Sequence, residues 1–324
     1  MPTSKAKPTV GITIGDAAGI GPEIVLKSLN DESVREACNC VVIGDGHHVQ
    51  GLADLHGVDL EQIRVHDLAN LPKEFEIGCD SAVTGKAAGE NIEAAVKLWR
   101  DGRIDAISTA PISKTAIQLG GYNFPGHTEM LAELTETKQF AMSFFANKLR
   151  VVLLSTHHSL RHAIDLVQKD ALVELIRFSD AHLRRILHRD VKFAIAGLNP
   201  HASEGGKFGS EESDEILPAI KHCRGLGIDI SGPHSPDTVF LRGYKGEFDA
   251  VIALYHDQAT IAVKSISFGS AVNVTLGLPL IRTSVDHGTA YDIAGKWIAD
   301  ESSMKAAIKL AGELAQNSRP PVQI

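Results

Sequence analysis

The chain has 324 residues, of which 44% are hydrophobic and 22% are charged, and its formal net charge at pH 7 is −8. This length allows about two domains with ample cores. The acidic balance and the lack of a long basic block argue against a nucleic-acid partner. Four cysteines without C-x-x-C spacing, and the lack of a long apolar run, predict a cytoplasmic protein with free thiols and no membrane partner.

The first third of the chain alternates between strand and helix patterns. Residues 9–14 form a β-branched run that ends in the glycine turn GDAAGIGPE, and a helix follows to about Leu29. The glycine spacing of this turn differs from the G-x-G-x-x-G of dinucleotide-binding turns. Further strands are expected at 40–43, 62–66 and 104–108, and helices at 47–56 and 84–100. This alternation predicts a parallel sheet covered on both faces, with ligands at the carboxyl ends of its strands.

The segment NFPGHTE precedes a helix that is expected at 130–136. Thr128 taken alone is most simply the cap of that helix. A helix start that carries His127 and Thr128 is equally a place to hold an anion. A hairpin expected at 140–145 and 149–154 then interrupts the parallel pattern, which indicates a change of domain.

Beyond the hairpin the pattern continues with longer helices. We expect one helical region at 160–187, a strand at 191–196, a helix at 211–224 capped by Ser210, and a terminal helix at 300–316. The segment 232–238 contains two prolines and is expected to be an irregular loop.

Three histidines each follow an apolar run: His157 in LLSTHHS, His201 in AGLNPHAS and His256 in ALYHDQ. One such histidine is more often a structural residue. Three at separate strand ends can converge, because a sheet brings those ends together. Neutral imidazoles suit zinc and related divalent ions, and three of them leave a coordination position open for substrate. The pattern predicts a catalytic site for Zn, Mg, Mn or Co.

The stretch 251–290 carries isolated polar residues between apolar runs. After His256 and Asp257 come Lys264, Asn273, Arg282 and the break Asp286-His287-Gly288-Thr289. Polar groups released at the ends of buried strands are typical of a site held on a rigid sheet, although ordinary solvated strand ends give the same pattern.

The motifs GDAAGIGPE, PGHTE, STHHSLR, GLNPHASEGG, LYHDQ and VNVTLGLPLIRTSVDHGTA, in this order, resemble the 4-hydroxythreonine-4-phosphate dehydrogenase family of vitamin B6 biosynthesis. The resemblance implies a fold like that of isocitrate and isopropylmalate dehydrogenases, with two α/β/α domains and a cleft between them. We place the first domain at 1–130 plus 290–324. The second, with the metal ligands and the dimer contacts, is placed at 131–289. The resemblance also implies a homodimer whose active site is shared between the subunits.

The same resemblance assigns roles to residues of this chain. His157, His201 and His256 fall on the metal ligands. The positions that match substrate-binding residues are His127, Thr128, Lys264, Asn273 and Arg282. Lys264, Asp237 and Asp257 are the catalytic candidates, the two aspartates for orienting a metal-bound histidine or moving a proton. By analogy with the related dehydrogenases, the loop Asp286, His287, Gly288 and Thr289 would contact NAD.

NFPGHTEML and HGTAYDIAGK look more like the paralogous branch that acts on 4-phospho-D-threonate or 4-phospho-D-erythronate. That branch implies metal- and NAD-dependent oxidation at C3 with decarboxylation, giving dihydroxyacetone phosphate, CO2 and NADH. The sequence departs from both branches at Ala18, where proline is usual, and at Ala259-Thr260-Ile261, which replaces a glycine-containing run. The alternatives are 4-hydroxythreonine-4-phosphate dehydrogenase of pyridoxal phosphate biosynthesis and, in another class, a non-catalytic sugar-phosphate-binding protein.

Overall fold

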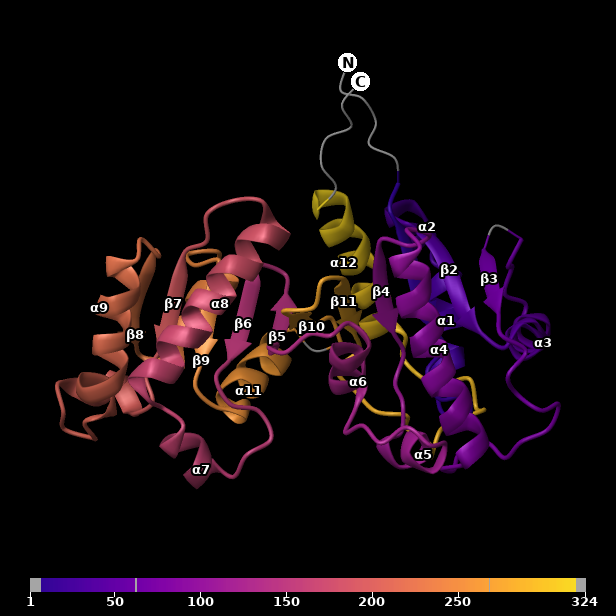
Figure 1. The fold of residues 1–324 in the computed structure, drawn as a ribbon, viewed down its shortest axis with the longest axis horizontal. Coiled ribbons are helices and arrows are strands. Elements are labelled where there is room, and N and C mark those ends of the chain that lie inside the picture. Colours follow the sequence, from indigo (N-terminus) through magenta and orange to yellow (C-terminus); the bar gives the residue numbers. More distant parts are fainter. Residues whose placement is uncertain (1–6, 62, 268, 319–324) are drawn as a thin grey trace, which may run out of the picture. The chain divides into compact units, whose positions relative to one another are not determined.

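The computed structural model describes residues 7–61, 63–267 and 269–318. The chain divides into two compact units (Figure 1). Unit 1 comprises Met1–Gln139 and Leu278–Ile324, and unit 2 comprises Phe140–Gly277. Each unit is a β-sheet covered by helices.

The sheet of unit 1 is parallel throughout, with the strand order β3-β2-β1-β4-β11. Its strands are β1 (Thr9–Thr13), β2 (Asn39–Gly44), β3 (Arg64–Asp67), β4 (Ala106–Thr109) and β11 (Ile281–Ser284). Thr109 at the end of β4 is in register with Thr13 on one side and with Ser284 on the other. The loops after these three strands therefore leave the sheet from one edge.

Helices cover both faces of this sheet. They are α1 (Gly21–Leu29), α2 (Glu32–Ala37), α3 (Gly46–His56), α4 (Ala82–Arg100), α5 (Lys114–Leu119), α6 (His127–Leu134) and α12 (Ser302–Ser318). Successive strand residues point to opposite faces. Val42 accordingly belongs to the core cluster formed with α1, α2 and α12, whereas Val41 and Ile43 belong to the cluster formed with α4 and α6.

The sheet of unit 2 has the order β10-β5-β6-β9-β7-β8. Its strands are β5 (Ala141–Ala146), β6 (Leu149–Leu153), β7 (Phe193–Ala196), β8 (Ile230–His234), β9 (Ala250–Ala253) and β10 (Val272–Leu276). β5 and β6 form the expected antiparallel hairpin, and β10 is antiparallel to β5. The pairs β6–β9, β9–β7 and β7–β8 are parallel.

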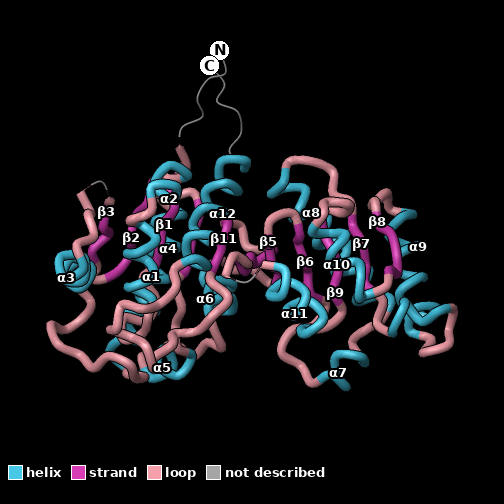
Figure 2. The backbone as a smooth tube through the Cα atoms, turned by 180° about the vertical axis from the view of Figure 1, so that it is seen from behind, coloured by secondary structure: helices cyan, strands magenta, loops and turns pink. Residues whose placement is uncertain are grey.

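The helices of unit 2 also lie on both faces of its sheet. They are α7 (Leu160–Asp165), α8 (Lys169–Leu187), α9 (Leu217–Gly225), α10 (Pro236–Tyr244) and α11 (His256–Ile266). α8 lies in front of the sheet in Figure 1, and α10 and α11 lie in front of it in Figure 2, which is seen from behind. Val239 and Phe240 of α10 and Ala259 and Val263 of α11 pack into one core cluster with β6 and β9. Among the described residues, no helix has both the length and the apolar composition needed to cross a membrane.

The unit boundaries differ from the expected domains. Segments 131–139 and 278–289 were expected in the second domain but belong to unit 1. The reason is packing: α6 contacts α4, and β11 completes the parallel sheet by pairing with β4.

The segment 232–238, expected to be irregular, is regular. Pro233 lies in β8, the edge strand, where a missing N–H costs no ladder bond. Pro236 opens α10, where the first N–H groups have no partner within the helix. The prediction of an irregular loop was wrong because both prolines occupy positions in regular structure that tolerate proline.

Three helix predictions also change. The region 160–187 is interrupted between α7 and α8, where Val167 turns into the core. The helix expected at 211–224 opens with a π-helical turn, η2 (Glu212–Ile216), before α9. α6 begins at His127 with Gly126 as its N-cap, so Thr128 lies in the first turn and is not the cap.

Candidate active site

The three strand-end histidines of unit 2 follow adjacent parallel strands. β9 lies between β6 and β7 and is parallel to both. The loop after β6 carries His157, the loop after β7 carries His201, and α11 begins at His256 directly after β9. Because the carboxyl ends of parallel strands share one edge, the fold places all three loops along that edge.

His157 and His256 lie close together, with 5.7 Å between their ring centroids. Nδ1 of His256 is 2.7 Å from Oδ1 of Asp257. A carboxylate at this distance holds the proton on Nδ1 and leaves the lone pair of Nε2 for another partner. Asp257 thus contacts His256 as an orienting carboxylate would.

His201 is presented by an unusual turn. His201, Ala202, Ser203 and Glu204 have φ values of 52°, 52°, 67° and 44°. Four consecutive non-glycine residues in the left-handed region are strained, at about 1–2 kcal/mol for each residue. Such strain persists only where the surroundings hold it and is concentrated at functional sites. The His201 side chain is exposed.

Within the described ranges, no three His, Cys, Asp or Glu side chains gather closely enough to hold a metal ion. The structure thus brings two of the three predicted ligands together and leaves His201 outside a three-ligand group. The donor chemistry nevertheless fits a divalent ion of the zinc type. The two imidazoles are adjacent, and one of them has its second nitrogen fixed by a carboxylate, as in many metal sites.

The other predicted side chains of unit 2 are more widely spread. Asp237 and Asp257 line one open groove of about 440 Å³ between α10 and α11. Lys264 is exposed on α11, eight residues beyond His256, which corresponds to about 12 Å along the helix axis. Asn273 is half-buried on β10, opposite Phe144 of β5.

In unit 1 the structure groups Arg282 with Thr109 and His127. Arg282 lies on β11 and is only 3% exposed, and its Nη2 donates to Oγ1 of Thr109 at 2.9 Å. Burial lowers the pKa of Arg282 to about 10, and the charge of Glu129 partly offsets this. The guanidinium remains protonated at neutral pH.

His127 opens α6, and its Nε2 is buried without a hydrogen-bond partner among the described residues. Burial, and next the nearby charge of Arg282, hold the pKa of His127 well below its usual value. A neutral imidazole beside a buried guanidinium is suited to an anionic ligand, since the guanidinium supplies the charge.

The loop Asp286–Thr289 follows β11 and packs on the N-terminal glycine turn. Ile20 N donates to Thr289 O at 2.9 Å, and a Cβ on Gly19 would lie 2.9 Å from Cβ of Thr289. Gly19 is therefore required by the close approach of two protein segments. Asp286 Oδ1 accepts from Ser303 at 3.3 Å, and space is open around Gly288. A half-buried carboxylate beside open backbone is compatible with a ribose hydroxyl.

The two departures from the resemblance have distinct surroundings. Ala18 N donates to Oδ1 of Asp16 at 2.9 Å, a bond that proline could not make. Ala259 lies on the buried face of α11, whereas Ile261 of the same helix is 66% exposed and lines the groove beside Asp257. The second departure therefore changes the surface next to the histidine pair.

Sequence reasoning missed four residues around the predicted groups. Thr109 binds Arg282, and the charge of Glu129 acts on it. Glu212 accepts from Asn199 N and Gln258 donates to Gly197 O, both in the loop before His201. Thr109 and Arg282 are 173 positions apart in the chain, so no local sequence pattern predicts their contact. Gln258 could have been found from its place in the His-Asp-Gln motif. Glu212 gave no signal, because its role depends on the π-helical turn.

The family described as pyridoxal phosphate biosynthetic protein PdxA matches residues 36–311 of the chain. A D-threonate 4-phosphate dehydrogenase from Cupriavidus necator is 45% identical over 324 residues, covering 95% of this chain and 97% of the relative. A putative D-threonate 4-phosphate dehydrogenase from Oceanobacillus iheyensis is 43% identical over 326 residues, covering 95% and 98%. The crystal structure of 4-hydroxythreonine-4-phosphate dehydrogenase from Klebsiella pneumoniae matches with a TM-score of 0.88 and 38% identity, over 97% of this chain and all of that one.

The structural match confirms the expected fold class, the α/β fold of the isocitrate dehydrogenase type. The family match spans well over half of the chain, and the relatives cover nearly all of it. The chain therefore belongs to the family of the pyridoxal phosphate biosynthetic protein PdxA.

Proposed function

We propose that the chain is a cytoplasmic metal- and NAD-dependent dehydrogenase that works as a homodimer. It oxidises C3 of 4-phospho-D-threonate or 4-phospho-D-erythronate with decarboxylation and yields dihydroxyacetone phosphate, CO2 and NADH. Relatives named D-threonate 4-phosphate dehydrogenase, 43–45% identical over nearly the whole chain, support an oxidoreductase that acts on a CH–OH group of a small phosphorylated substrate. The observation that carries the proposal is the pair His157 and His256, with Asp257 behind the second ring.

The residues of unit 1 would bind an anionic group of the substrate. The buried guanidinium of Arg282 supplies a permanent charge with a planar set of donors, and Thr109 fixes its orientation. His127 would donate or accept a hydrogen bond as a neutral imidazole through its buried Nε2. Thr128, Lys264 and Asn273 are further proposed substrate contacts.

His157, His201 and His256 would hold the divalent ion. Such an ion lowers the pKa of a bound hydroxyl and polarises a neighbouring carbonyl. Asp257 holds the proton on Nδ1 of His256 and so keeps Nε2 available as a ligand. We further propose that both subunits of a homodimer contribute ligands to this site.

Proton transfer would fall to Asp237, Asp257 or Lys264. The two aspartates line one groove and are solvent-accessible, so either can pass a proton to water. Asp286, His287, Gly288 and Thr289 would contact NAD, which accepts the hydride from C3. The C3 ketone formed from a 4-phosphorylated hydroxy acid is a β-keto acid. Its C1–C2 bond breaks to release CO2, and the electron pair is left on C2, which is then protonated.

The test is NADH formation by the purified protein, with Zn²⁺, Mg²⁺, Mn²⁺ or Co²⁺, from three substrates in parallel. Turnover of 4-phospho-D-threonate or 4-phospho-D-erythronate, with dihydroxyacetone phosphate as product, is the expected result. Turnover of 4-hydroxythreonine 4-phosphate alone would assign the chain to the biosynthetic activity. That alternative is favoured by the solved structure of that name, which aligns over 97% of the chain.

A non-catalytic sugar-phosphate-binding protein is the alternative of a different class. It would bind the phosphorylated acids without forming NADH, whichever metal is supplied. A dehydrogenase activity that a chelator removes and a divalent ion restores excludes that alternative.

A further inference from the structure

Glu212 is a buried carboxylate whose hydrogen bonds all lead to the loop before His201. Its side chain belongs to the π-helical turn η2, and the residue is 3% exposed. Oε1 accepts from Leu198 N at 2.8 Å and from Asn199 N at 2.7 Å, and Oε2 accepts from Asn199 Nδ2 at 2.9 Å. Hydrogen bonds from backbone N–H groups to a buried carboxylate are strong and directional.

A second side chain, that of Gln258, also binds this segment. Nε2 of Gln258 donates to Gly197 O at 2.8 Å, and its Oε1 accepts from Leu254 N at 2.8 Å. Gln258 lies two residues beyond His256 on α11. The segment 197–199 is therefore clamped between the helix that carries His256 and the turn that carries Glu212.

The left-handed turn rests directly on this clamped segment. Ala202 N donates to Asn199 O at 3.1 Å. A Cβ on Gly197 would lie 2.9 Å from Cα of Ala202 and 3.3 Å from Oε1 of Glu212. The turn therefore packs closely against the segment, and no side chain fits at position 197. The strained conformation of His201 thus depends on contacts that Glu212 makes two and three residues earlier.

The π-helical turn explains why two neighbouring carboxylates reach one amide. Asn199 Nδ2 donates to Oε2 of Glu211 at 2.8 Å as well as to Glu212. Side chains at i and i+1 of a regular α-helix do not face the same partner. The widened turn directs both toward Asn199, and such turns are frequent at functional sites.

We propose that Glu212 is a positioning residue that holds the loop 197–205 so that His201 is presented as a ligand to a divalent ion. The proposal rests on the proposed function for the ion itself. The clamp consists of contacts between protein groups, so it can be measured separately.

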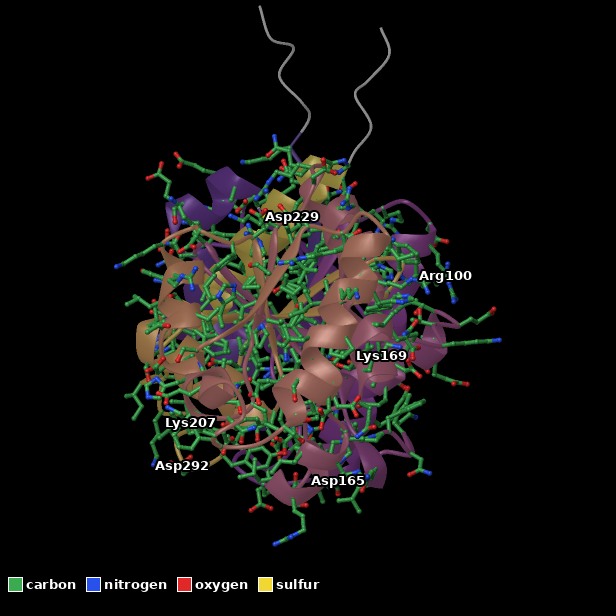
Figure 3. All side chains as sticks on the ribbon, turned by 90° about the vertical axis from the view of Figure 1, so that its left-hand side faces the viewer. Arg100, Asp165, Lys169, Lys207, Asp229 and Asp292 are labelled. Atoms are coloured by element: carbon green, nitrogen blue, oxygen red, sulfur yellow. The ribbon has the colours of Figure 1, made fainter. Side chains whose placement is uncertain are left out.

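The experiment compares wild type, Glu212→Gln and the control Asp214→Asn. Glutamine keeps the shape of the side chain, but its NH2 group would replace Oε2 and face the NH2 group of Asn199. Two donors cannot form a hydrogen bond with each other. Asp214 lies in the same turn and is exposed, and its Oδ1 accepts from Ser213, so its variant removes the same charge without touching the loop. Lys207, labelled in Figure 3, marks the surface part of the peptide to be followed.

Two quantities are measured on the metal-free and the Zn²⁺-titrated protein. Hydrogen–deuterium exchange of the peptide 197–207 is expected to speed up at least about tenfold in Glu212→Gln and to stay unchanged in Asp214→Asn. Calorimetric titration with Zn²⁺ is expected to give a dissociation constant about 10- to 100-fold weaker in Glu212→Gln, the usual effect of losing a residue that orients a ligand.

Unchanged exchange, or Zn²⁺ affinity equal to that of the control, overturns the role of Glu212 and leaves the proposed function standing. Failure of the wild type to bind Zn²⁺, Mn²⁺ or Co²⁺ overturns the proposed function, while the exchange data still decide whether Glu212 clamps the loop. Should Glu212→Gln unfold, Asn199→Ser removes the side-chain bonds to Glu211 and Glu212 and keeps the backbone bonds to Glu212. A several-fold weakening of Zn²⁺ binding is then expected, and no weakening overturns the proposal.

Discussion

Arg282 shows at the scale of one residue how burial and charge prepare a binding group. The guanidinium lies on β11 inside unit 1, held by Thr109, and keeps its charge although burial lowers its pKa. If Arg282 binds the substrate as proposed, its replacement with alanine removes charge-assisted hydrogen bonds, each worth about 1.5–3 kcal/mol. We expect Arg282→Ala to lower kcat/KM by about 10- to 100-fold.

Arg282→Lys is the matched variant, because it keeps the charge and loses the planar set of donors. Its kcat/KM should fall between those of wild type and Arg282→Ala. Steady-state kinetics with a phosphorylated hydroxy acid measures both effects, and thermal unfolding of each variant controls for folding. Wild-type kcat/KM in a folded Arg282→Ala protein would contradict a role in binding.

His127 makes stability depend on pH. Its folded-state pKa lies well below the value of about 6.5 in the unfolded chain, because burial disfavours the charged ring. The unfolded state therefore binds a proton below pH 6.5 that the folded state does not. Above pH 6.5 the ring is neutral in both states and does not reduce the free energy of unfolding. Below pH 6.5 the free energy of unfolding decreases as the pH falls, by at most about 1.4 kcal/mol per pH unit.

His127→Asn should flatten the decline of the free energy of unfolding between pH 7 and pH 5. Chemical denaturation at a series of pH values gives that slope for wild type and variant. Other buried histidines such as His48 and His182 contribute equally to both proteins, so the difference isolates His127. Identical slopes would show that the ring is not shielded from water.

The sequence predicted correctly that His157, His201 and His256 follow strands of unit 2, because each comes after an apolar run. Their role as metal ligands stays a prediction. Partners that come from a distant part of the chain were not identifiable, since Thr109 meets Arg282 and Glu212 meets Asn199 only after folding. A local sequence pattern shows which side chains follow the end of a strand. It does not show which residues from distant parts of the chain contact them.

At the scale of elements, Gln258 joins α11 to the loop after β7. Its two hydrogen bonds are made with Leu254 N and Gly197 O, and both of these residues are buried. Gln258→Leu removes both bonds, at about 1–3 kcal/mol each. We expect the free energy of unfolding to fall by roughly 2–6 kcal/mol.

Chemical denaturation followed by a unit 2 probe measures this loss. Gln118→Leu is the control, because Gln118 is exposed on α5 of unit 1, and its variant should change stability by less than about 0.5 kcal/mol. Equal stabilities of the two variants would mean that water replaces the contacts of Gln258.

Element types were largely predictable, and the exceptions have physical reasons. The alternation of strands and helices and the hairpin at 140–154 follow from apolar periodicity. The strand β8 and helix α10 were missed because Pro233 and Pro236 occupy an edge strand and a first helical turn, the places where proline costs little. The assignment of 278–289 failed because β11 follows unit 2 in the chain but pairs with β4 of unit 1.

At the scale of the whole molecule, the proposed site, to which both subunits contribute, predicts complementation between subunits. If each ion takes the pair from one subunit and His201 from the other, His157→Ala and His201→Ala are each inactive and weak in metal binding. Mixed dimers, however, contain one intact site. Co-refolding equal amounts should restore about a quarter of wild-type activity, since half of the dimers are mixed and each has one working site of two.

Activity and bound Zn²⁺ of the re-formed mixture are measured together, with co-refolded wild type as the reference and His158→Ala, a neighbouring exposed position, as the control. Mixed dimers are isolated by two different affinity tags. Isolated mixed dimers without activity would assign His157 and His201 of each site to the same subunit and contradict the proposed sharing of these two ligands.

The discontinuity of unit 1 bears on how the polypeptide matures on the ribosome. Part of unit 1 is made before unit 2, yet β11 and α12 are made only after residues 140–277. Unit 2 therefore has its full set of strands first, while β4 still lacks its neighbour β11. Nascent chains halted when residue 277 has just left the ribosome should thus resist protease over unit 2 and remain cleavable over the earlier part.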